Sequence, residues 1–223
     1  MTENYLDPIF PSILSTNLFN LESKLKAFED GKIDFIHLDI MDGHFVDNLS
    51  FGPSTASAIK SKFPFQIDSH LMVDNPVKMI PHFIKNGSDW ISFHVETVPG
   101  NEIPSVIGMI TDQGRKAGLV INPNTPVESV FPFLDALHFV LIMSVFPGKG
   151  GQSFITGSID RVAQLKQEII RRNLSCLIQV DGGINASNIG ILKKAGADLF
   201  VIGTYLFNSD HIDETLSLIR TNL

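Results

Sequence analysis

Short apolar segments recur along the chain, and each is bounded by glycine, proline, asparagine or charged residues. Apolar segments of this length, between turn-forming residues, are typical of strands that are buried on both faces, as in a parallel sheet. The pattern predicts eight strands, at residues 9–14, 34–41, 65–73, 89–95, 116–122, 138–145, 174–180 and 198–203.

Amphipathic segments lie between the predicted strands. In residues 17–30, apolar side chains recur every three or four positions, which places them on one face of a helix. Residues 160–172 and 187–195 show the same spacing. The apolar positions of the first segment are Leu18, Leu21, Leu25 and Phe28.

A glycine followed closely by an aspartate marks three of the predicted helix-to-strand turns. Gly31, Gly87 and Gly196 stand where a helix gives way to the next strand, and glycine is common at such helix ends. The aspartates that follow them are Asp34, Asp89 and Asp198. This pattern is the nearest approach to an internal repeat in the chain.

Eight strand–helix units share 223 residues, or about 28 residues per unit. Parallel strands joined by helices form either an open doubly wound sheet or a closed (β/α)8 barrel. Eight units favour the barrel, although the chain is near its lower size limit, and no G-x-G-x-x-G follows the first strand to support the dinucleotide-binding alternative. Because no linker or change of composition marks a boundary, we expect an α/β fold in which residues 1–223 form a single (β/α)8 TIM barrel.

The overall charge narrows the classes of partner. The chain has 24 acidic and 17 basic residues, a formal charge of −7 and no long basic run. This argues against a nucleic-acid or anionic-membrane surface, but it allows a small anionic substrate if the site is locally positive. The N-terminal residues do not resemble a signal peptide, no apolar run reaches about 20 residues, and Cys176 is the only cysteine. We therefore expect a cytoplasmic protein with no membrane and no nucleic-acid partner.

Polar residues late in the predicted strands are the candidates for chemistry, because catalytic groups of barrels gather at the carboxyl ends of strands. His37 and Asp39 are two positions apart on one strand and so share a face, and buried charges of this kind need partners. Together with His70 and Asp181 they offer nitrogen and oxygen ligands that suit Zn²⁺ and are acceptable to Fe²⁺, Mn²⁺ or Co²⁺. Either histidine taken alone is equally consistent with a hydrogen-bonded core residue. Of the other histidines, His94 is intermediate, and solvated or capping roles are expected for His44, His82, His138 and His211.

Glycines at three neighbouring strand ends predict a phosphate site. Such residues let backbone N–H groups approach an anion closely, and the loop after the sixth strand is rich enough in glycine to move as a lid. Phosphate sites after the seventh and eighth strands recur in barrels. The residues are Gly148, Gly150 and Gly151, then Gly182 and Gly183, then Gly203 with Thr204. Methionine is usually core filler, but Met41, Met72 and Met143 all lie near these strand ends and would form the apolar wall of a site.

Several motifs, in order along nearly the whole chain, resemble the ribulose-phosphate 3-epimerase family. They are PSILS (11–15), IHLDIMDGHFVDN (36–48), DSHLMV (68–73), FHVE (93–96), LIMSVFPGKGGQSF (141–154), VDGGIN (180–185) and AGADLFVIGT (195–204).

The resemblance implies a homo-oligomeric barrel that interconverts D-ribulose 5-phosphate and D-xylulose 5-phosphate with one divalent metal ion. It implies that His37, Asp39, His70 and Asp181 hold the metal and that Asp39 and Asp181 are the catalytic acid and base. Two carboxylates on opposite faces of a substrate can remove and return a proton, and a divalent ion can stabilise the enediolate between these steps. By the same resemblance, the substrate is contacted by Ser12, His70, Gly148, Lys149, Gly150, Gly151, Gly182, Gly183, Gly203 and Thr204.

The sequence departs from the family pattern at three places, and the change at Asp47 is expected to alter loop stiffness rather than chemistry. Asp47 stands where proline is usual, and Lys149 stands where phenylalanine is usual, so that Lys149 either attracts the phosphate or is simply solvated. The segment GTYLF (203–207) replaces the commoner GSAIF and resembles allulose-6-phosphate 3-epimerases. A hexulose-phosphate 3-epimerase, acting on allulose 6-phosphate and fructose 6-phosphate, therefore remains an alternative.

Two further classes are disfavoured by the candidate residues. A non-catalytic sugar-phosphate-binding barrel would need the glycines but not the buried carboxylates. A barrel decarboxylase of the orotidine type would need a catalytic lysine near a strand end, and the second and third predicted strands contain none at that position.

Overall fold

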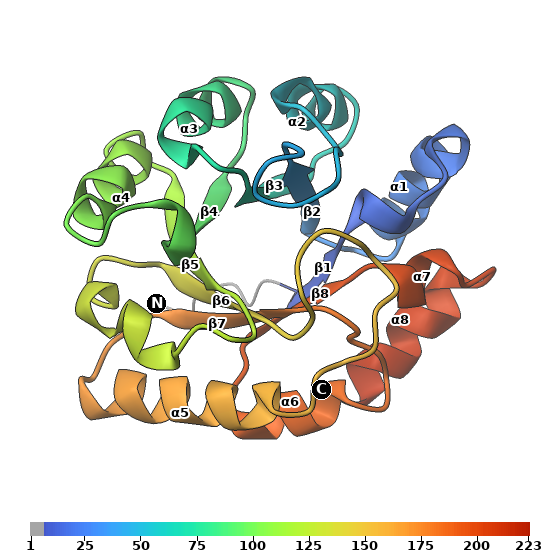
Figure 1. The fold of residues 1–223 in the computed structure, drawn as a ribbon. Coiled ribbons are helices and arrows are strands. Elements are labelled where there is room, and N and C mark those ends of the chain that lie inside the picture. The colour runs from blue at the N-terminus through green and yellow to red at the C-terminus, as the bar shows by residue number, and fades with distance from the viewer. Residues whose placement is uncertain (1–6) are drawn as a thin grey trace.

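The computed structural model describes residues 7–223, and eight parallel strands in this range form one sheet in the order β1-β8-β7-β6-β5-β4-β3-β2 (Figure 1). An isolated parallel bridge between Ser12 and His37 joins the two outer strands, β1 and β2. The sheet is thereby closed into the predicted (β/α)8 barrel. The strands are β1 (Ile9–Pro11), β2 (Phe35–Met41), β3 (Gln66–Met72), β4 (Trp90–His94), β5 (Lys116–Ile121), β6 (Phe139–Met143), β7 (Leu177–Asp181) and β8 (Leu199–Ile202).

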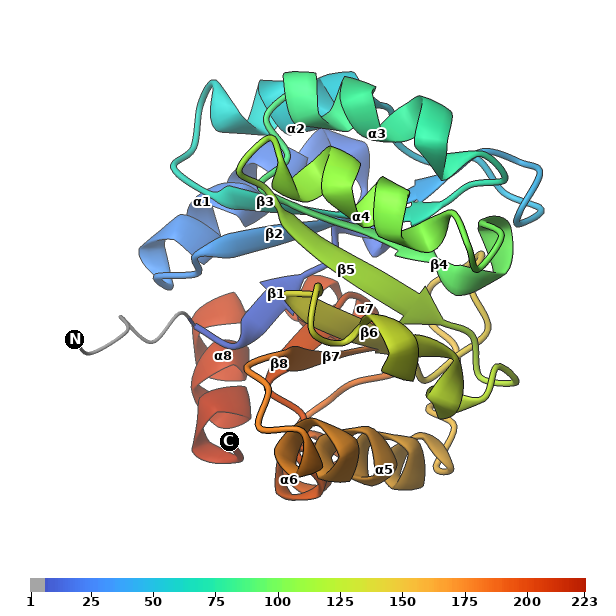
Figure 2. The same cartoon turned by 90° about the vertical axis from the view of Figure 1, so that its left-hand side faces the viewer.

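Helices form an outer ring around the strands (Figure 1). The strand arrows run toward one end of the barrel, and the C-terminus lies near the other (Figure 2). The helices are α1 (Leu21–Asp30), α2 (Pro53–Lys60), α3 (Pro76–Lys85), α4 (Ile103–Thr111), α5 (Ser158–Arg171), α6 (Ile189–Ala195), α7 (Thr204–Phe207) and α8 (Ile212–Thr221). None of the helices within residues 7–223 combines the length and the apolar composition needed to cross a lipid bilayer.

Aromatic side chains fill the barrel at the level where the strands begin. The ring of Phe35 lies 4.4 Å from that of Phe10 and 4.9 Å from that of Trp90, which in turn lies 5.0 Å from Phe139 (centroid distances). Gly118 leaves room for this layer, because a Cβ there would lie 2.4 Å from the ring of Phe139. Alternate residues of a strand share a face. The inward positions further along β2, β3, β4 and β7 hold polar residues above this aromatic layer, whereas those of β6 and β8 hold Leu141, Met143 and Val201.

The three aspartates of the glycine–aspartate repeat have a common structural role. The carboxylate of Asp89, just before β4, accepts a hydrogen bond from the N–H of Ile67 in β3 (2.9 Å). Asp198, just before β8, accepts from the N–H of Ile178 in β7 (2.9 Å). Asp34, just before β2, accepts from the N–H of Asp7 near the start of β1 (2.9 Å). Each aspartate thus fastens the beginning of its strand to the preceding strand.

The predicted first strand, residues 9–14, is too long. The strand ends at Pro11, and a 3-10 helix (Ile13–Ser15) follows it. The side chain of Ser12 causes this change, because its Oγ accepts a hydrogen bond from the N–H of Leu14 (3.2 Å) and caps the 3-10 helix. The sequence analysis also expects no signal peptide at the N-terminus. Residues 1–6 of that segment lie outside the described residues.

Two helical segments also differ from a regular alternation of strands and α-helices. Residues 17–30 begin with a 3-10 helix (Leu18–Asn20) before α1, and Leu18 is therefore exposed rather than buried on the helix face. The connection from β5 to β6 is a 3-10 helix (Val127–Phe133), which contains Pro132. Proline lacks the N–H that an α-helix needs in its interior. The predicted helices at 160–172 and 187–195 correspond to α5 and α6.

Candidate metal and substrate site

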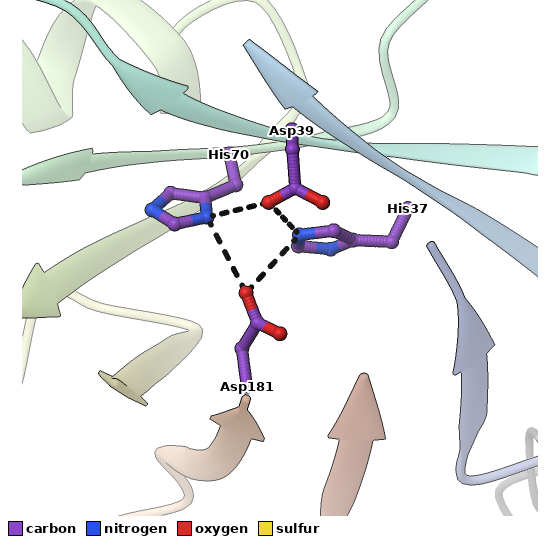
Figure 3. A group of neighbouring side chains, drawn as sticks. All are labelled: His37, Asp39, His70 and Asp181. Atoms are coloured by element: carbon purple, nitrogen blue, oxygen red, sulfur yellow. Dashed lines mark ion pairs between the residues drawn. The ribbon is translucent and has the colours of Figure 1, made fainter. Parts of the chain in front are cut away.

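Four side chains from three strands meet at the carboxyl end of the barrel. β2 supplies His37 and Asp39, β3 supplies His70, and Asp181 at the end of β7 faces them from the other side (Figure 3). One potential ligand atom from each lies within 4.8 Å of the others. Asp39 Oδ1 is 3.4 Å from His37 Nε2 and 3.3 Å from His70 Nδ1, whereas Asp181 Oδ2 is 3.9 and 3.8 Å from the same two nitrogens. The structure therefore brings together the four residues that the sequence singled out.

The inward nitrogen atoms of both histidines fit a metal ion. His37 Nε2 and His70 Nδ1 are buried, and neither has a hydrogen-bond partner among the described residues. Their other ring nitrogens do have partners: His37 Nδ1 lies 2.8 Å from Asp68 Oδ2, and His70 Nε2 lies 2.9 Å from His94 Nε2. Two unpartnered imidazole nitrogens beside two carboxylates form a suitable donor set for one divalent ion.

The two carboxyl groups of the site differ in proton affinity. Burial alone would raise the pKa of Asp39, but the positive charge of the neighbouring His37, with the imidazole of His70 close by, holds that pKa well below its usual range. Burial and the neighbouring charge of Asp39 raise the pKa of Asp181 to about 8. At neutral pH the metal-free pair therefore consists of an ionised Asp39 and a protonated Asp181. Environments that separate two carboxyl pKa values in this way are typical of acid–base pairs.

The two histidines of the site, His37 and His70, also differ in their pKa values. Although burial lowers the pKa of His37, the carboxylates of Asp39 and Asp68 raise it well above the usual value. Burial lowers the pKa of His70 to about 4, and its neighbour His94 contributes to this shift. His70 is thus a neutral imidazole at pH 7, which is the form that binds a metal.

Hydroxyl groups hold Asp39 in place. Ser12 Oγ donates to Asp39 Oδ2 at 2.5 Å, and Ser50 Oγ donates to the backbone oxygen of Asp39, also at 2.5 Å. Ser12 was expected to contact the substrate. The structure places its side chain against Asp39 at the edge of the cavity described next.

A cavity of about 560 Å³ opens above the cluster of His37, Asp39, His70 and Asp181. His37 and His70 lie fully buried beneath it, and Asp39 and Asp181 form part of its wall. The other predicted site residues that line the cavity are Ser12, Met41, Met72, Met143, Gly148, Lys149, Gly150, Gly151, Gly182, Gly183, Gly203 and Thr204. Its volume lies within the range of ordinary small-molecule sites.

The loop after β6 covers one side of this cavity and is fastened at two points. Asn48 Nδ2 donates to the backbone oxygen of Gly148 (3.0 Å). Gln152 Nε2 donates to the backbone oxygens of Phe146 (2.6 Å) and Lys149 (2.8 Å). The Lys149 side chain is exposed, and no described residue forms an ion pair with it. The Asn48 amide therefore ties the loop to the segment after β2, and the Gln152 amide braces the loop internally.

Backbone geometry requires glycine at the turn after β7. Gly182 and Gly183 have φ angles of +121° and +65°, which disfavour other residues. A Cβ at Gly182 would lie 2.8 Å from the backbone nitrogen of Val145, and one at Gly183 would lie 2.7 Å from that of Phe154. The turn consequently exposes main chain, without side chains, to the cavity.

Two residues support the histidines of the site: sequence reasoning missed Asp68, and it named His94 only as an intermediate candidate without a role. Asp68 is fully buried and accepts hydrogen bonds from His37 and, at 2.8 Å, from Gln179 Nε2. His94 contacts His70 and, through Nδ1, Glu96 Oε2 at 3.1 Å. The signal for Asp68 was available, because Asp68 and His70 show the same two-residue spacing as His37 and Asp39.

The remaining histidines are peripheral to the site. His44, His82 and His211 are exposed, as expected. His138 is not simply solvated or capping: it is half-buried and packs edge-on against Trp90, with ring centroids 4.6 Å apart.

Comparison with known proteins places the chain among enzymes of one kind. The model of the ribulose-phosphate 3-epimerase family matches residues 8–207. Ribulose-phosphate 3-epimerase of Aquifex aeolicus is 41% identical over 203 residues, which are 91% of this chain and 90% of that protein. The enzyme of the same name from Bacillus subtilis is 38% identical over 213 residues, or 95% and 97% of the two chains. Ribulose-5-phosphate-3-epimerase of Arabidopsis thaliana, a chloroplastic protein, is 36% identical over 96% of this chain and 76% of its own.

One solved structure has a fold similar to that of this chain. The crystal structure of 3-hexulose-6-phosphate synthase superimposes with a TM-score of 0.72 and covers 97% of this chain and all of that one. Since only 12% of residues are identical, this likeness concerns the barrel alone.

Proposed function

Since the chain belongs to the ribulose-phosphate 3-epimerase family, we propose that it interconverts D-ribulose 5-phosphate and D-xylulose 5-phosphate. The observation that carries this proposal is the pair formed by Asp39 and Asp181. The two residues project toward one another from β2 and β7, which lie well apart around the barrel, and their environments push their pKa values in opposite directions.

These two carboxyl groups can carry out inversion at a carbon next to a carbonyl. In one direction, the ionised Asp39 takes the proton from C3 on one face of the substrate, and the electron pair left behind is shared with the adjacent carbonyl as an enediolate. Protonated Asp181 then gives its proton to C3 on the opposite face, which yields the other epimer. In the reverse direction the two residues exchange roles.

The donor set supports a metal-assisted version of this reaction. His37, Asp39, His70 and Asp181 would hold one divalent ion, with His37 Nε2 and His70 Nδ1 as the nitrogen ligands. When bound, the ion would supply Lewis-acid stabilisation of the negative charge that develops on the substrate. Zinc is the ion that this mixed nitrogen and oxygen set suits best, and Fe²⁺, Mn²⁺ and Co²⁺ are also acceptable.

The cavity offers a place for the phosphate at a distance from the carboxylates. The turns at Gly182–Gly183 and Gly203–Thr204, with the loop Gly148–Gly151, present main chain rather than bulky side chains to the cavity. We propose that backbone N–H groups of these segments hold the phosphate, with Lys149 at the rim. The apolar side chains of Met41, Met72 and Met143 would flank the flat enediolate without offering protons.

Substrate profiling tests this proposal. The protein is stripped of metal, reconstituted with defined divalent ions, and assayed with ribulose 5-phosphate and with allulose 6-phosphate. We expect efficient turnover of the pentulose phosphate and little turnover of the hexulose phosphate. Negligible pentulose turnover by metal-loaded protein would refute the proposal, and a preference for allulose 6-phosphate would favour the hexulose-phosphate alternative that the segment 203–207 suggests. Turnover of neither sugar would favour a binding protein.

A further inference from the structure

His70 is the first of three side chains linked in a row. Its Nε2 atom lies 2.9 Å from Nε2 of His94, and His94 Nδ1 lies 3.1 Å from Oε2 of Glu96. Both imidazoles are fully buried, and the Glu96 side chain is one-quarter exposed. The row runs from the cluster at the centre of the barrel to the turn that follows β4.

The contacts at the outer end of the row fix where its protons lie. Glu96 is ionised at neutral pH, because its hydrogen bonds hold its pKa near 2 against the effect of burial. A carboxylate only accepts hydrogen bonds, so His94 must carry its proton on Nδ1 to make the contact with Glu96. His94 Nε2 is then an acceptor, and the hydrogen bond between the two imidazoles requires the proton on His70 Nε2. His70 Nδ1 is left with a lone pair that faces the metal cluster.

The position of Glu96 is fixed by contacts that do not involve His94. Its Oε1 accepts hydrogen bonds from the N–H of Asn122 (3.0 Å) and from the hydroxyl of Thr125. Arg161 Nη2 in turn donates to the backbone oxygens of Asn122 (2.7 Å) and Thr125 (2.8 Å) and holds this turn in place. The carboxylate that orients His94 is therefore anchored to the turn after β5.

We infer that Glu96, acting through His94, is a positioning residue that keeps His70 in the tautomer whose Nδ1 atom can bind the metal. The inference rests on the metal centre of the proposed function and adds to it two residues that are not among the four proposed ligands and do not line the cavity. Partners that orient a metal-bound histidine in this way typically change metal affinity 10–100-fold when they are replaced.

Glu96→Gln is a sharp test, because the substitution keeps the shape of the side chain and reverses the direction of its hydrogen bond with His94. The fixed N–H of Asn122 requires the amide oxygen at the Oε1 position, which turns the amide NH₂ toward His94. His94 would then accept at Nδ1 and carry its proton on Nε2, where it opposes the proton on His70 Nε2. His70 must move that proton to Nδ1 or rotate away, and either change impairs the ligand. Thr125→Val is the matched control, because it removes another hydrogen bond to the same carboxylate and leaves the His94 contact intact.

The experiment measures zinc affinity by chelator competition and imidazole protonation by NMR of ¹⁵N-histidine-labelled protein, in the zinc-loaded and the metal-free state. We expect wild-type His94 to be protonated on Nδ1, Glu96→Gln to move this proton to Nε2 and to weaken zinc binding at least 10-fold, and Thr125→Val to change neither. In a His94→Phe background, Glu96→Gln should cause no further loss of affinity.

Three results would overturn the inference. They are a wild-type His94 protonated on Nε2, a zinc affinity of Glu96→Gln within twofold of wild type, and an equal loss of zinc affinity when Glu96→Gln is introduced into the wild type and into the His94→Phe variant. A wild-type protein that binds no zinc would refute the proposed metal centre itself. Zinc bound at the cluster, with wild-type His94 protonated on Nε2, would refute only the role of Glu96 and His94.

Discussion

His37 Nδ1 donates a hydrogen bond of 2.8 Å to Oδ2 of Asp68, a fully buried carboxylate one strand away. When the imidazole is neutral, as metal binding requires, this bond takes its one ring proton, so that Nε2 carries a lone pair and points at the cluster formed with Asp39 and His70. Gln179 donates to the same oxygen of Asp68 from across the barrel, at 2.8 Å. Asp68 Oδ1, in contrast, has no partner among the described residues. The orientation of His37, one of the proposed metal ligands, therefore depends on a single carboxylate oxygen.

Two substitutions of Asp68 should differ in their effect. Asp68→Asn can keep an oxygen toward His37 and place its NH₂ at the unpartnered Oδ1 position, so we expect zinc affinity to fall less than about 10-fold. Asp68→Ala removes the acceptor and should lower zinc affinity by about 10–100-fold. Chelator competition on both variants checks this, with thermal unfolding as the control for folding. Equal affinities of the alanine variant and the wild type would show that His37 is oriented by other contacts.

Asp39→Asn and Asp181→Asn should each abolish most of the activity, because an amide can neither take nor give the C3 proton. Loss of a general acid or base typically costs 10²–10⁴-fold, and both variants should also bind metal more weakly. The measurement is kcat/KM for ribulose 5-phosphate with saturating metal. Asp135→Asn is the matched control, because Asp135 is exposed and lies in the segment that leads into the start of β6, away from the cavity. Near-normal rates in either active-site variant would disprove the two-carboxylate scheme.

The raised pKa of Asp181 makes the stability of the metal-free protein depend on pH. An unfolded aspartate has a pKa of about 3.9, whereas burial and Asp39 raise that of folded Asp181 to about 8. Between these values the folded state holds a proton that the unfolded state has lost, so the free energy of unfolding decreases as pH rises from about 4 to about 8. Urea unfolding of chelator-treated protein measures this dependence, and Asp181→Asn should have a flatter profile than the wild type. Parallel profiles would show that Asp181 ionises normally in the fold.

Gly182→Ala should destabilise the turn that we assign to phosphate binding. The φ angle of Gly182 is +121°, and an added Cβ would lie 2.8 Å from the backbone nitrogen of Val145. Strain and crowding together should lower the free energy of unfolding by about 2 kcal/mol or more and raise KM for the phosphorylated substrate. Gly157→Ala is the control, because Gly157 has a φ of −59° and open space around its Cβ position. If both variants unfold alike in urea, the backbone of Gly182 is not under the constraint described here.

Much of the barrel follows from the sequence, because its strands are buried on both faces and stand out as apolar segments between glycines and aspartates. The exact end of β1 does not, since a single hydroxyl, that of Ser12, converts the predicted strand end into a 3-10 helix. The 3-10 segment before β6 was also not foreseen, although Pro132 within it was a visible sign.

The meeting of His37, Asp39, His70 and Asp181 could be predicted because they are polar side chains in, or at the end of, otherwise apolar strands. The supporting residues are harder to find, since their role depends on contacts between strands. Asp68 could have been identified by its two-residue spacing from His70. The row from His70 to Glu96 could not, because the contact between His70 and His94 arises only when β3 and β4 pair in the observed register.

Transfer of the C3 proton to and from carboxylates is the central claim, and isotope exchange tests it most directly. Metal-loaded protein is incubated with D-ribulose 5-phosphate in D₂O, and the products are followed by ¹H NMR. The account predicts D-xylulose 5-phosphate that has lost its C3 hydrogen signal, because carboxyl protons exchange with the solvent between turnovers. Xylulose 5-phosphate that fully retains the original hydrogen at C3, or the absence of any xylulose 5-phosphate, would contradict it.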